Sequence, residues 1–415
     1  MGRSPGFSVN SVTFPLPLPT NTASFPSPMN QRSACFRIAL VSLVPLCSSL
    51  DLEAGDYGKA IIDDKAPVAS SSLCDFFDKA VLYKNDDFLP LQKFALTGRL
   101  QADAAFFDAD QGDYDSLEWR RFRFGFKSKH YDNFILHAEA DIDLVDSDPL
   151  YNKLTDTYIG WSKSEELEIK LGKHGAGFTL DGATSSKSLI RMERSLLSHN
   201  MWFPEEYFTG LSASGEVGNW LYNVGVFSSD GGPEFGDFEA GYFGLFSIGY
   251  DFADALTCDT AIVRVDYVHN DPTGRGTLNT RNLTDVISLN ATLEQGAFGL
   301  RSELLFAEGW GTQSDLNGFS VMPYYNISDE WQLVASYNYI TSDDPNGVRL
   351  DRYESRIESG RSDEAHEFYF GVNRYFCGHK LKWQTGVEYT TASDSANDGG
   401  AYDGWGLSSG IRISW

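Results

Sequence analysis

The chain has 415 residues and a formal net charge of −25, and aromatic residues make up 14% of it. Because phosphate neutralisation needs a basic face, this acidic composition argues against nucleic acid as a partner. A helix that crosses a bilayer needs roughly 20 consecutive apolar residues. The one apolar run of note, Ile38 to Leu50, is shorter, which excludes a helical membrane protein.

The N-terminal region has the features of an export leader. Arg32 and Arg37 precede the apolar run, and Leu52-Glu53-Ala54 follows it as a cleavage site. We therefore assign residues 1–54 to a leader and signal peptide, with Met29 as an alternative start and a lipoprotein signal at Cys47 as a weaker alternative. Residues 55–93 are expected to form a short periplasmic extension, which either packs on the following domain or is only tethered to it.

Three cysteines lie beyond the leader: Cys74, Cys258 and Cys377. Their number is odd and none is spaced as CxxC, so neither a zinc site nor a disulfide framework is expected. At most one disulfide can form.

From Phe94 onward, segments of about ten residues alternate between apolar and polar side chains, as in strands whose two faces meet different environments. The pattern predicts about sixteen strands within a single domain, residues 94–415. Their expected ranges are 94–104, 118–128, 133–144, 155–163, 167–174, 208–217, 220–228, 240–251, 259–269, 284–295, 297–308, 317–327, 330–341, 364–376, 379–391 and 402–415.

The connections between these strands fall into two classes. Those after even-numbered strands are short, such as Gly218-Asn219, whereas those after odd-numbered strands are mostly long and acidic, as at 108–117, 229–239, 271–284 and 342–363. Short turns at one end and long loops at the other are typical of an outer-membrane barrel.

The two faces of the predicted strands agree with this architecture. In 120–128, the phenylalanines at 122, 124 and 126 share one side, and Arg121, Arg123 and Lys127 share the other. Sixteen strands enclose too wide a lumen for a dry core, so the apolar side is expected to meet lipid and the charged side water. The fold class is therefore an all-β, transmembrane antiparallel barrel of about 16 strands in an outer membrane of the Gram-negative type.

The strand ends carry further signals. The last strand ends in Trp415, the kind of terminal aromatic residue that barrel-assembly machinery reads. Aromatic rings near strand ends are expected at the membrane interface: Tyr158, Trp161, Trp220, Tyr222, Trp331, Trp383 and Trp405.

A pore also needs a narrow zone whose charges set the preference among solutes. The best candidate is the long connection 175–206, which we expect to fold inward; the alternative is an external lid. Its candidate constriction residues are Lys187, Arg191, Glu193 and Arg194. The candidate lumen residues on the wall are Arg121, Arg123, Lys127, Lys170 and Arg264, facing Glu139, Asp141 and Asp266. The alternative is that these are ordinary solvated charges.

Several segments resemble the phosphate-selective porin O and P family. The residues that carry the resemblance are Leu91–Gln101, Glu118–Gly125, Ala138–Asp141, Lys170–His174, Thr184–Lys187 and Met192–Ser195. The resemblance covers about residues 90–415 and is sharpest before about residue 200. It implies a trimeric, sixteen-stranded general or anion-favouring porin, in a family where some members select phosphate with arginines and lysines near the constriction. The net charge of −25 departs from such a basic pore.

The leading hypothesis for function is therefore an outer-membrane porin for passive diffusion of small hydrophilic solutes and ions, with anions or phosphate as candidates. The alternative is a non-transport barrel that acts as an adhesin or surface scaffold. No catalytic set, cofactor site or metal site is expected, although His174 and His199 flank the candidate loop. The expected partners are outer-membrane lipid, lipopolysaccharide, the barrel-assembly machinery and two further copies of the chain.

Overall fold

The computed structural model describes residues 73–144, 149–201, 203, 206–275, 278–345, 347–395 and 399–415. The predicted leader, residues 1–54, and the first part of the predicted extension lie outside these residues, so these assignments stay predictions. Within the described ranges, no helix has the length and apolar character needed to span a membrane.

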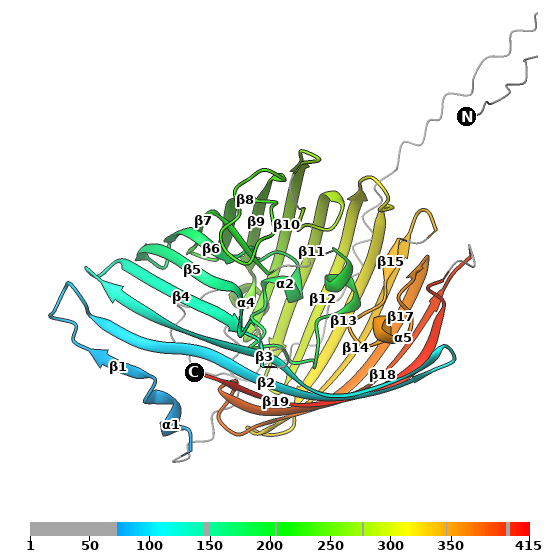
Figure 1. Ribbon diagram of the computed structural model, residues 1–415. Coiled ribbons are helices and arrows are strands. Elements are labelled where there is room, and N and C mark those ends of the chain that lie inside the picture. The colour runs from blue at the N-terminus through cyan, green and yellow to red at the C-terminus, as the bar shows by residue number, and fades with distance from the viewer. Residues whose placement is uncertain are drawn as a thin grey trace, which may run out of the picture. The chain divides into compact units, whose positions relative to one another are not determined.

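Sixteen strands form the wall of a closed antiparallel barrel (Figure 1). Each strand pairs with the next, and the last pairs with the first to close the ring, from Ser414 opposite Arg99 to Gly404 opposite Ala109. All sixteen predicted strands are confirmed. The wall strands are β2 (Lys93–Ala109), β3 (Gly112–His130), β4 (Phe134–Ile142), β5 (Tyr151–Ser164), β6 (Leu167–Gly175), β7 (Tyr207–Val217), β8 (Trp220–Ser228), β9 (Gly241–Asp251), β10 (Thr260–Pro272), β11 (Leu283–Gln295), β12 (Phe298–Gly309), β13 (Leu316–Asn326), β14 (Trp331–Ser342), β17 (Glu364–Tyr375), β18 (Leu381–Ser393) and β19 (Tyr402–Ser414).

Shorter elements lie in the N-terminal segment and in the connections. The strands are β1 (Val81–Lys84), β15 (Val348–Arg349) and β16 (Arg361–Ser362), and the helices are α1 (Asp75–Asp78), α2 (Leu180–Ala183), α3 (Leu196–Met201), α4 (Ala253–Leu256) and α5 (Glu354–Ile357).

The faces of the strands are segregated as predicted. Phe124 and Leu289 are 46% and 41% exposed on the outer face, whereas their neighbours Arg123 and Asn290 are 3% and 5% exposed on the inner face. This is the reverse of a soluble barrel, and it is what a wall between lipid and an aqueous interior requires. The outer side chains can meet hydrocarbon without leaving a charge unsolvated.

Two predictions about this wall are wrong. Residues 108–117 do not form a loop, because β2 and β3 stay paired up to Ala109 opposite Gly112. The acidic residues that suggested a loop alternate with Phe107 and Tyr114, which pack inward against Tyr353. Tyr158 does not lie at the lipid interface either. It is 6% exposed and packs edge-on against the rings of His137 and His174.

The pairing of the wall changes where the chain turns inward after β6. β6 ends at Gly175, so β5 pairs with β6 only from Thr157 to Ser164. Beyond this point, residues 232–234 of the β8–β9 connection lie beside β5 and β6. Leu154 N donates to Pro233 O (2.8 Å), and the ammonium group of Lys173 donates to the carbonyls of residues 232, 233 and 234 (2.8, 3.3 and 2.7 Å). This connection is a loop, as predicted, and residues 232–234 of it pack against the wall.

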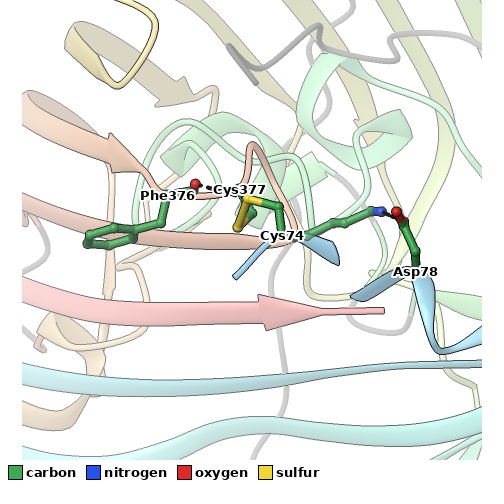
Figure 2. The surroundings of a disulfide bond; sticks show 5 residues. Cys74, Asp78, Phe376 and Cys377 are labelled. Carbon is green, nitrogen blue, oxygen red and sulfur yellow. Dashed lines mark hydrogen bonds and ion pairs between the residues drawn. A yellow bond between two sulfur atoms is a disulfide. The ribbon is translucent and has the colours of Figure 1, made fainter. Parts of the chain in front are cut away.

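The N-terminal segment is fastened to the end of the barrel that carries the short turns. β1 pairs with β2 from Val81 opposite Ala95 to Lys84 opposite Lys93, below the point where β19 ends. Beyond β1, Cys74 forms a disulfide with Cys377 in the β17–β18 turn, and Asp78 pairs with Lys380 at 2.9 Å (Figure 2). The three cysteines beyond the predicted leader allow at most one disulfide, and the bond between Cys74 and Cys377 is that disulfide. Because Phe77 is also buried, the segment packs on the rim and is not merely tethered.

We predict that the Cys74–Cys377 bond stabilises the closed barrel. A cross-link over a sequence separation of 303 residues removes conformational freedom from the unfolded chain, and such bonds contribute about 2–4 kcal/mol. The double variant Cys74→Ser/Cys377→Ser should unfold at a lower urea concentration than the wild type in detergent micelles, as followed by tryptophan fluorescence. Reductant should shift the wild type to the same midpoint. Cys258→Ser, which is outside this bond, is the control, and an unchanged midpoint in the double variant would contradict the prediction.

Candidate functional site

The β6–β7 connection, residues 176–206, runs into the barrel. α2 contacts β11 and β12, and α3 contacts β12, β13, β14 and the hairpin strand β15, so the connection crosses from β6 to the far wall. Figure 1 shows α2 within the ring of strands. The geometry matches the predicted inward loop rather than an external lid.

Polar contacts fix the loop to the inner wall. Leu180 N donates to Glu303 Oε1 (2.6 Å), Lys382 Nζ to Leu189 O (2.5 Å), and Asn373 Nδ2 to Ile190 O (2.8 Å). Arg191 pairs with Glu367 on β17. Backbone carbonyls that would otherwise be buried without partners therefore find donors on the wall.

An apolar cluster holds the two ends of the loop together. Phe203 packs against Phe178 and Phe243 with ring centroids 5.2 and 4.9 Å apart, and all three rings are at most 1% exposed. Leu197 and Met201 of α3 join the same cluster with inward-facing wall residues such as Ile340. The barrel interior is thus partly a dry apolar core at this level. The sequence predicted only charged side chains facing water there.

A β-bulge aims two consecutive arginines at this loop. In the pairing of β2 with β3, Gln101 lies opposite Arg121 and Ala102 opposite Trp119, so Arg120 is the extra residue. Bulges of this kind re-aim side chains. Arg120 points inward beside Arg121 and binds both carboxylate oxygens of Glu193 at 2.5 and 2.9 Å.

A cavity of about 450 Å³ lies between β3, the inward loop and the β14–β17 connection. Eight basic side chains and four acidic side chains line it. The basic ones are Arg120, Arg121, Arg123, Lys153, Arg194, Arg281, Arg352 and Arg356, and the acidic ones are Asp141, Glu193, Glu206 and Asp351. The cavity of this acidic protein is therefore rich in positive charge.

Glu206 is the carboxylate that holds the arginines of the cavity together. It lies 2.8 Å from Arg194, 3.4 Å from Arg123 and 3.6 Å from Arg121. These guanidinium groups hold the pKa of Glu206 well below its usual range despite its burial. One negative charge is thus shared by three positive charges, which leaves the group electropositive.

Lys187 belongs to a second group nearer the C-terminus. Its ammonium donates to Trp415 O (3.4 Å), and the adjacent Ser186 accepts from Arg99, which pairs with Glu139 at 3.4 Å. Burial, together with the positive charge of Arg99, lowers the pKa of Lys187 to about 8.

The remaining predicted residues lie apart from the cavity. Arg264 pairs with Asp266 (2.9 Å) and donates to Thr179 O, which helps to position the loop. Lys170 pairs with Glu168 at 3.1 Å. Lys127 lies opposite His137 on β4. Of the twelve predicted residues, the cavity brings together Arg121, Arg123, Asp141, Glu193 and Arg194.

Sequence reasoning missed the other cavity residues for two reasons. By simple alternation along β3, Arg120 would face outward. It faces inward because the bulge adds a residue at this position. Arg352 and Arg356 lie in a connection interpreted as acidic and external, although four arginines between 349 and 361 were a signal of a different role.

The two flanking histidines have different surroundings. His174 Nε2 lies 2.7 Å from Ser212 Oγ, and His199 Nδ1 lies 3.4 Å from Asp351. Burial and the nearby Arg281 lower the pKa of His199 to about 3, so it is neutral at pH 7. Over the described part of the chain, His, Cys, Asp and Glu form no group spaced to hold a metal ion.

Comparisons with known proteins agree with this geometry. A family model described as phosphate-selective porin O and P matches residues 94–401. Similar solved structures include an anion-selective porin from Comamonas acidovorans (12% identity, 78% of this chain and 99% of that chain, TM-score 0.55). OmpF of Salmonella typhi in complex with daunomycin (12%, 78% and 98%, TM-score 0.55) and the outer-membrane channel DcaP of Acinetobacter baumannii (12%, 80% and 99%, TM-score 0.52) share the fold as well. No curated protein sequence matches the chain.

A closed sixteen-stranded barrel with an apolar outer face and a charged interior defines an outer-membrane porin. Such a channel lets small hydrophilic solutes diffuse passively across an outer membrane of the Gram-negative type. Because the family model matches most of the chain, the protein belongs to the phosphate-selective porin O and P family. That family and this fold are typical of non-enzymatic channels.

We predict that the ion preference of the channel depends on pH through Lys187. With a pKa of about 8, its ammonium is charged at pH 7 and neutral at pH 9, so the permeability ratio of anions to cations should fall as pH rises between these values. Reversal potentials in a KCl gradient across a planar bilayer measure this ratio. Lys187→Met should remove the step, and Lys380→Met, on the exposed rim, should keep it. A step of equal size in Lys187→Met would show that another group titrates.

Proposed function

We propose that the protein is an anion-favouring porin whose selective zone is the arginine-lined cavity beside the inward loop. The observation that carries the proposal is the excess of arginine and lysine over carboxylate among the cavity residues. A concave, low-dielectric site lined by one sign of charge concentrates counter-ions of the other sign. The negative charge of the whole chain does not oppose this, because exposed charges more than about 10 Å apart are screened at 0.1 M salt.

The sequence-predicted residues have distinct roles in this proposal. Arg121, Arg123 and Arg194 supply the positive field. Glu206 lies between their guanidinium groups and reduces the repulsion among them. Glu193 does the same for Arg120. Arg191, Arg264 and Asp266 position the loop, and Asp141 pairs with Arg123 in the cavity (3.7 Å). Lys187, Glu139, Lys127 and Lys170 line the remaining path.

Phosphate is the anion that the family description suggests, and guanidinium groups match the geometry of phosphate oxygens. An anion-selective porin from Comamonas acidovorans shares the fold. These observations support, for this chain, a preference for oxyanions over cations.

We further propose that the working unit is a homotrimer embedded in lipid and lipopolysaccharide after insertion by the barrel-assembly machinery. A trimer form of OmpT from Vibrio cholerae has the same fold. The exposed aromatic side chain of Trp405 supports the membrane as a partner.

Single-channel recording tests the selective zone. The wild type should show a reversal potential that favours chloride in a tenfold KCl gradient. Arg121→Gln/Arg356→Gln should lower the chloride preference about twofold to fivefold, because two positive charges leave the wall of a narrow site. Glu206→Gln should raise it, because a negative charge is lost from the same site.

Arg374→Gln is the matched control for loss of one guanidinium, since Arg374 lies on the rim and pairs with Glu330. Its reversal potential should equal that of the wild type. A wild-type channel that favours potassium would overturn the proposed anion preference. Absence of any conductance from correctly folded protein would favour the adhesin or scaffold alternative.

A further inference from the structure

The β14–β17 connection folds into the loop-side mouth of the barrel. Its residues 351, 352, 355 and 356 line the arginine cavity. Tyr353 packs against Phe107 and Tyr114 of the β2–β3 hairpin, with ring centroids 5.0 and 6.3 Å apart. The hydroxyl of Tyr353 donates to Asp103 (3.3 Å), and α5 contacts β3. The position of this connection therefore determines how wide the cavity is.

Four carboxyl groups gather where α5 packs on the wall. Glu354 of α5 is 2% exposed, accepts a hydrogen bond from Thr390 on β18 (3.1 Å), and hydrogen-bonds the carboxyl group of Glu388 on the same strand. Asp351 and Glu367 are the other two members of this carboxyl cluster, and their negative charges act on the pair. Two carboxyl groups can hydrogen-bond each other only when one of them carries a proton. The arrangement therefore requires at least one bound proton.

Positive charge neutralises the carboxyl cluster only in part. Arg191 pairs with Glu367, yet the second carboxylate oxygen of Glu367 is buried without a hydrogen-bond partner among the described residues. Arg352, next to Asp351 in the chain, pairs with Glu118 on β3. The titratable groups that face the cluster from other elements are Arg191, Glu193 and the neutral His199 of the inward loop, Arg281 of the β10–β11 connection and Tyr402 of β19. Full ionisation of the cluster would thus leave an excess of negative charge in a buried site.

We propose that residues 350–357 form an acid-closed gate over the cavity, held in place by the protonated pair Glu354 and Glu388 and released when both carboxyl groups ionise. A buried carboxylate without a partner is costly, and release of the segment lets water solvate these charges. Opening enlarges the path beside the inward loop. The inference adds regulation to the proposed function, and it applies whichever ion the channel prefers.

The pH range of the gate follows from Glu354. Burial and the charge of Glu367 raise the pKa of Glu354 from its usual 4.5 to about 7. After release, water surrounds the carboxyl group and its pKa returns toward the usual value. The seated segment therefore binds more protons, so seating is strongest at acidic pH and weakens roughly a hundredfold as the pH rises from about 4.5 to about 7. Burial and the charge of Glu354 raise the pKa of Asp351 as well, which acts in the same direction.

Single-channel conductance in planar bilayers tests the gate. The conductance of the wild type should increase as the pH on both sides is raised from about 5 to about 8. Glu354→Gln/Glu388→Gln keeps hydrogen-bonding side chains that do not titrate, so its conductance should stay at the low wild-type value at both pH values. A step of wild-type size in this variant would contradict the gate.

Two controls isolate the carboxyl pair. Glu358→Gln removes a carboxylate of the same connection that bonds Gly360 N (2.8 Å), and it should keep the conductance step. Lys187→Met should keep the step too, because Lys187 affects the ratio of anion to cation permeability and lies outside the gate. Loss of the step in either control would overturn the assignment to Glu354 and Glu388.

A spin label on the segment reports the movement directly. The label is attached through Ser355→Cys, an exposed position on α5, in a protein whose other cysteines outside the disulfide are replaced by serine. Its mobility should rise between about pH 5 and pH 8 and stay low when Glu354→Gln/Glu388→Gln is added. Equal mobility at both pH values without these substitutions would overturn the gate, even where the conductance changes. A label that moves with pH in a folded barrel that conducts no ions would instead overturn the proposed channel function.

Discussion

In hydrocarbon there is no solvent to accept or donate a hydrogen bond, so each backbone amide of the wall must pair with another part of the chain. Pairing of β19 with β2 meets this requirement around the ring. Where β6 leaves the wall at Gly175, the carbonyl of Pro233 accepts the amide of Leu154 instead. Below the end of β19, β1 covers the edge of β2. The inward loop begins where the β5–β6 pairing ends, and Leu154 just beyond that pairing still has its amide satisfied by Pro233.

Much of the wall could be predicted from sequence because alternation is a local property. Phe124 faces outward and Arg123 inward because successive side chains of a strand point to opposite faces of the sheet. The extent of β2 and β3 could not be predicted in this way, because the acidic residues near their shared turn are as common in loops as on strands that rise beyond the hydrocarbon. Tyr158 shows the same limit, since its ring type fits both a membrane interface and a packed interior.

The candidate site was predictable only in part. The length of the β6–β7 connection indicated an inward loop, and its charged residues pointed to Glu193 and Arg194. The bulge at Arg120 depends on a register shift between β2 and β3 that the alternation of apolar and polar residues does not reveal. The entry of Arg356 into the cavity depends on contact between α5 and β3. Both are consequences of tertiary packing, so residue type and spacing could not reveal them.

The distribution of charge explains how an acidic chain can carry a basic site. Acidic side chains dominate the exposed ends of the strands, where water solvates them at little cost. The cavity instead concentrates arginine, whose delocalised and weakly hydrated charge is less costly to bury than that of lysine. Each of the deeper arginines shares a carboxylate with its neighbours, as at Glu206. Net charge therefore describes the surface of this molecule and says little about its interior.

The disulfide also reports the order of events during biogenesis. Cys74 precedes its partner by 303 residues in the chain, and Cys377 lies in a turn that forms only when β17 and β18 pair. Until then the native bond of Cys74 cannot form. Since Cys258 lies outside the bond, a maleimide reagent applied to the Cys258→Ser variant would label molecules that lack the Cys74–Cys377 bond and spare those that have it, so the bond marks completed pairing of β17 with β18.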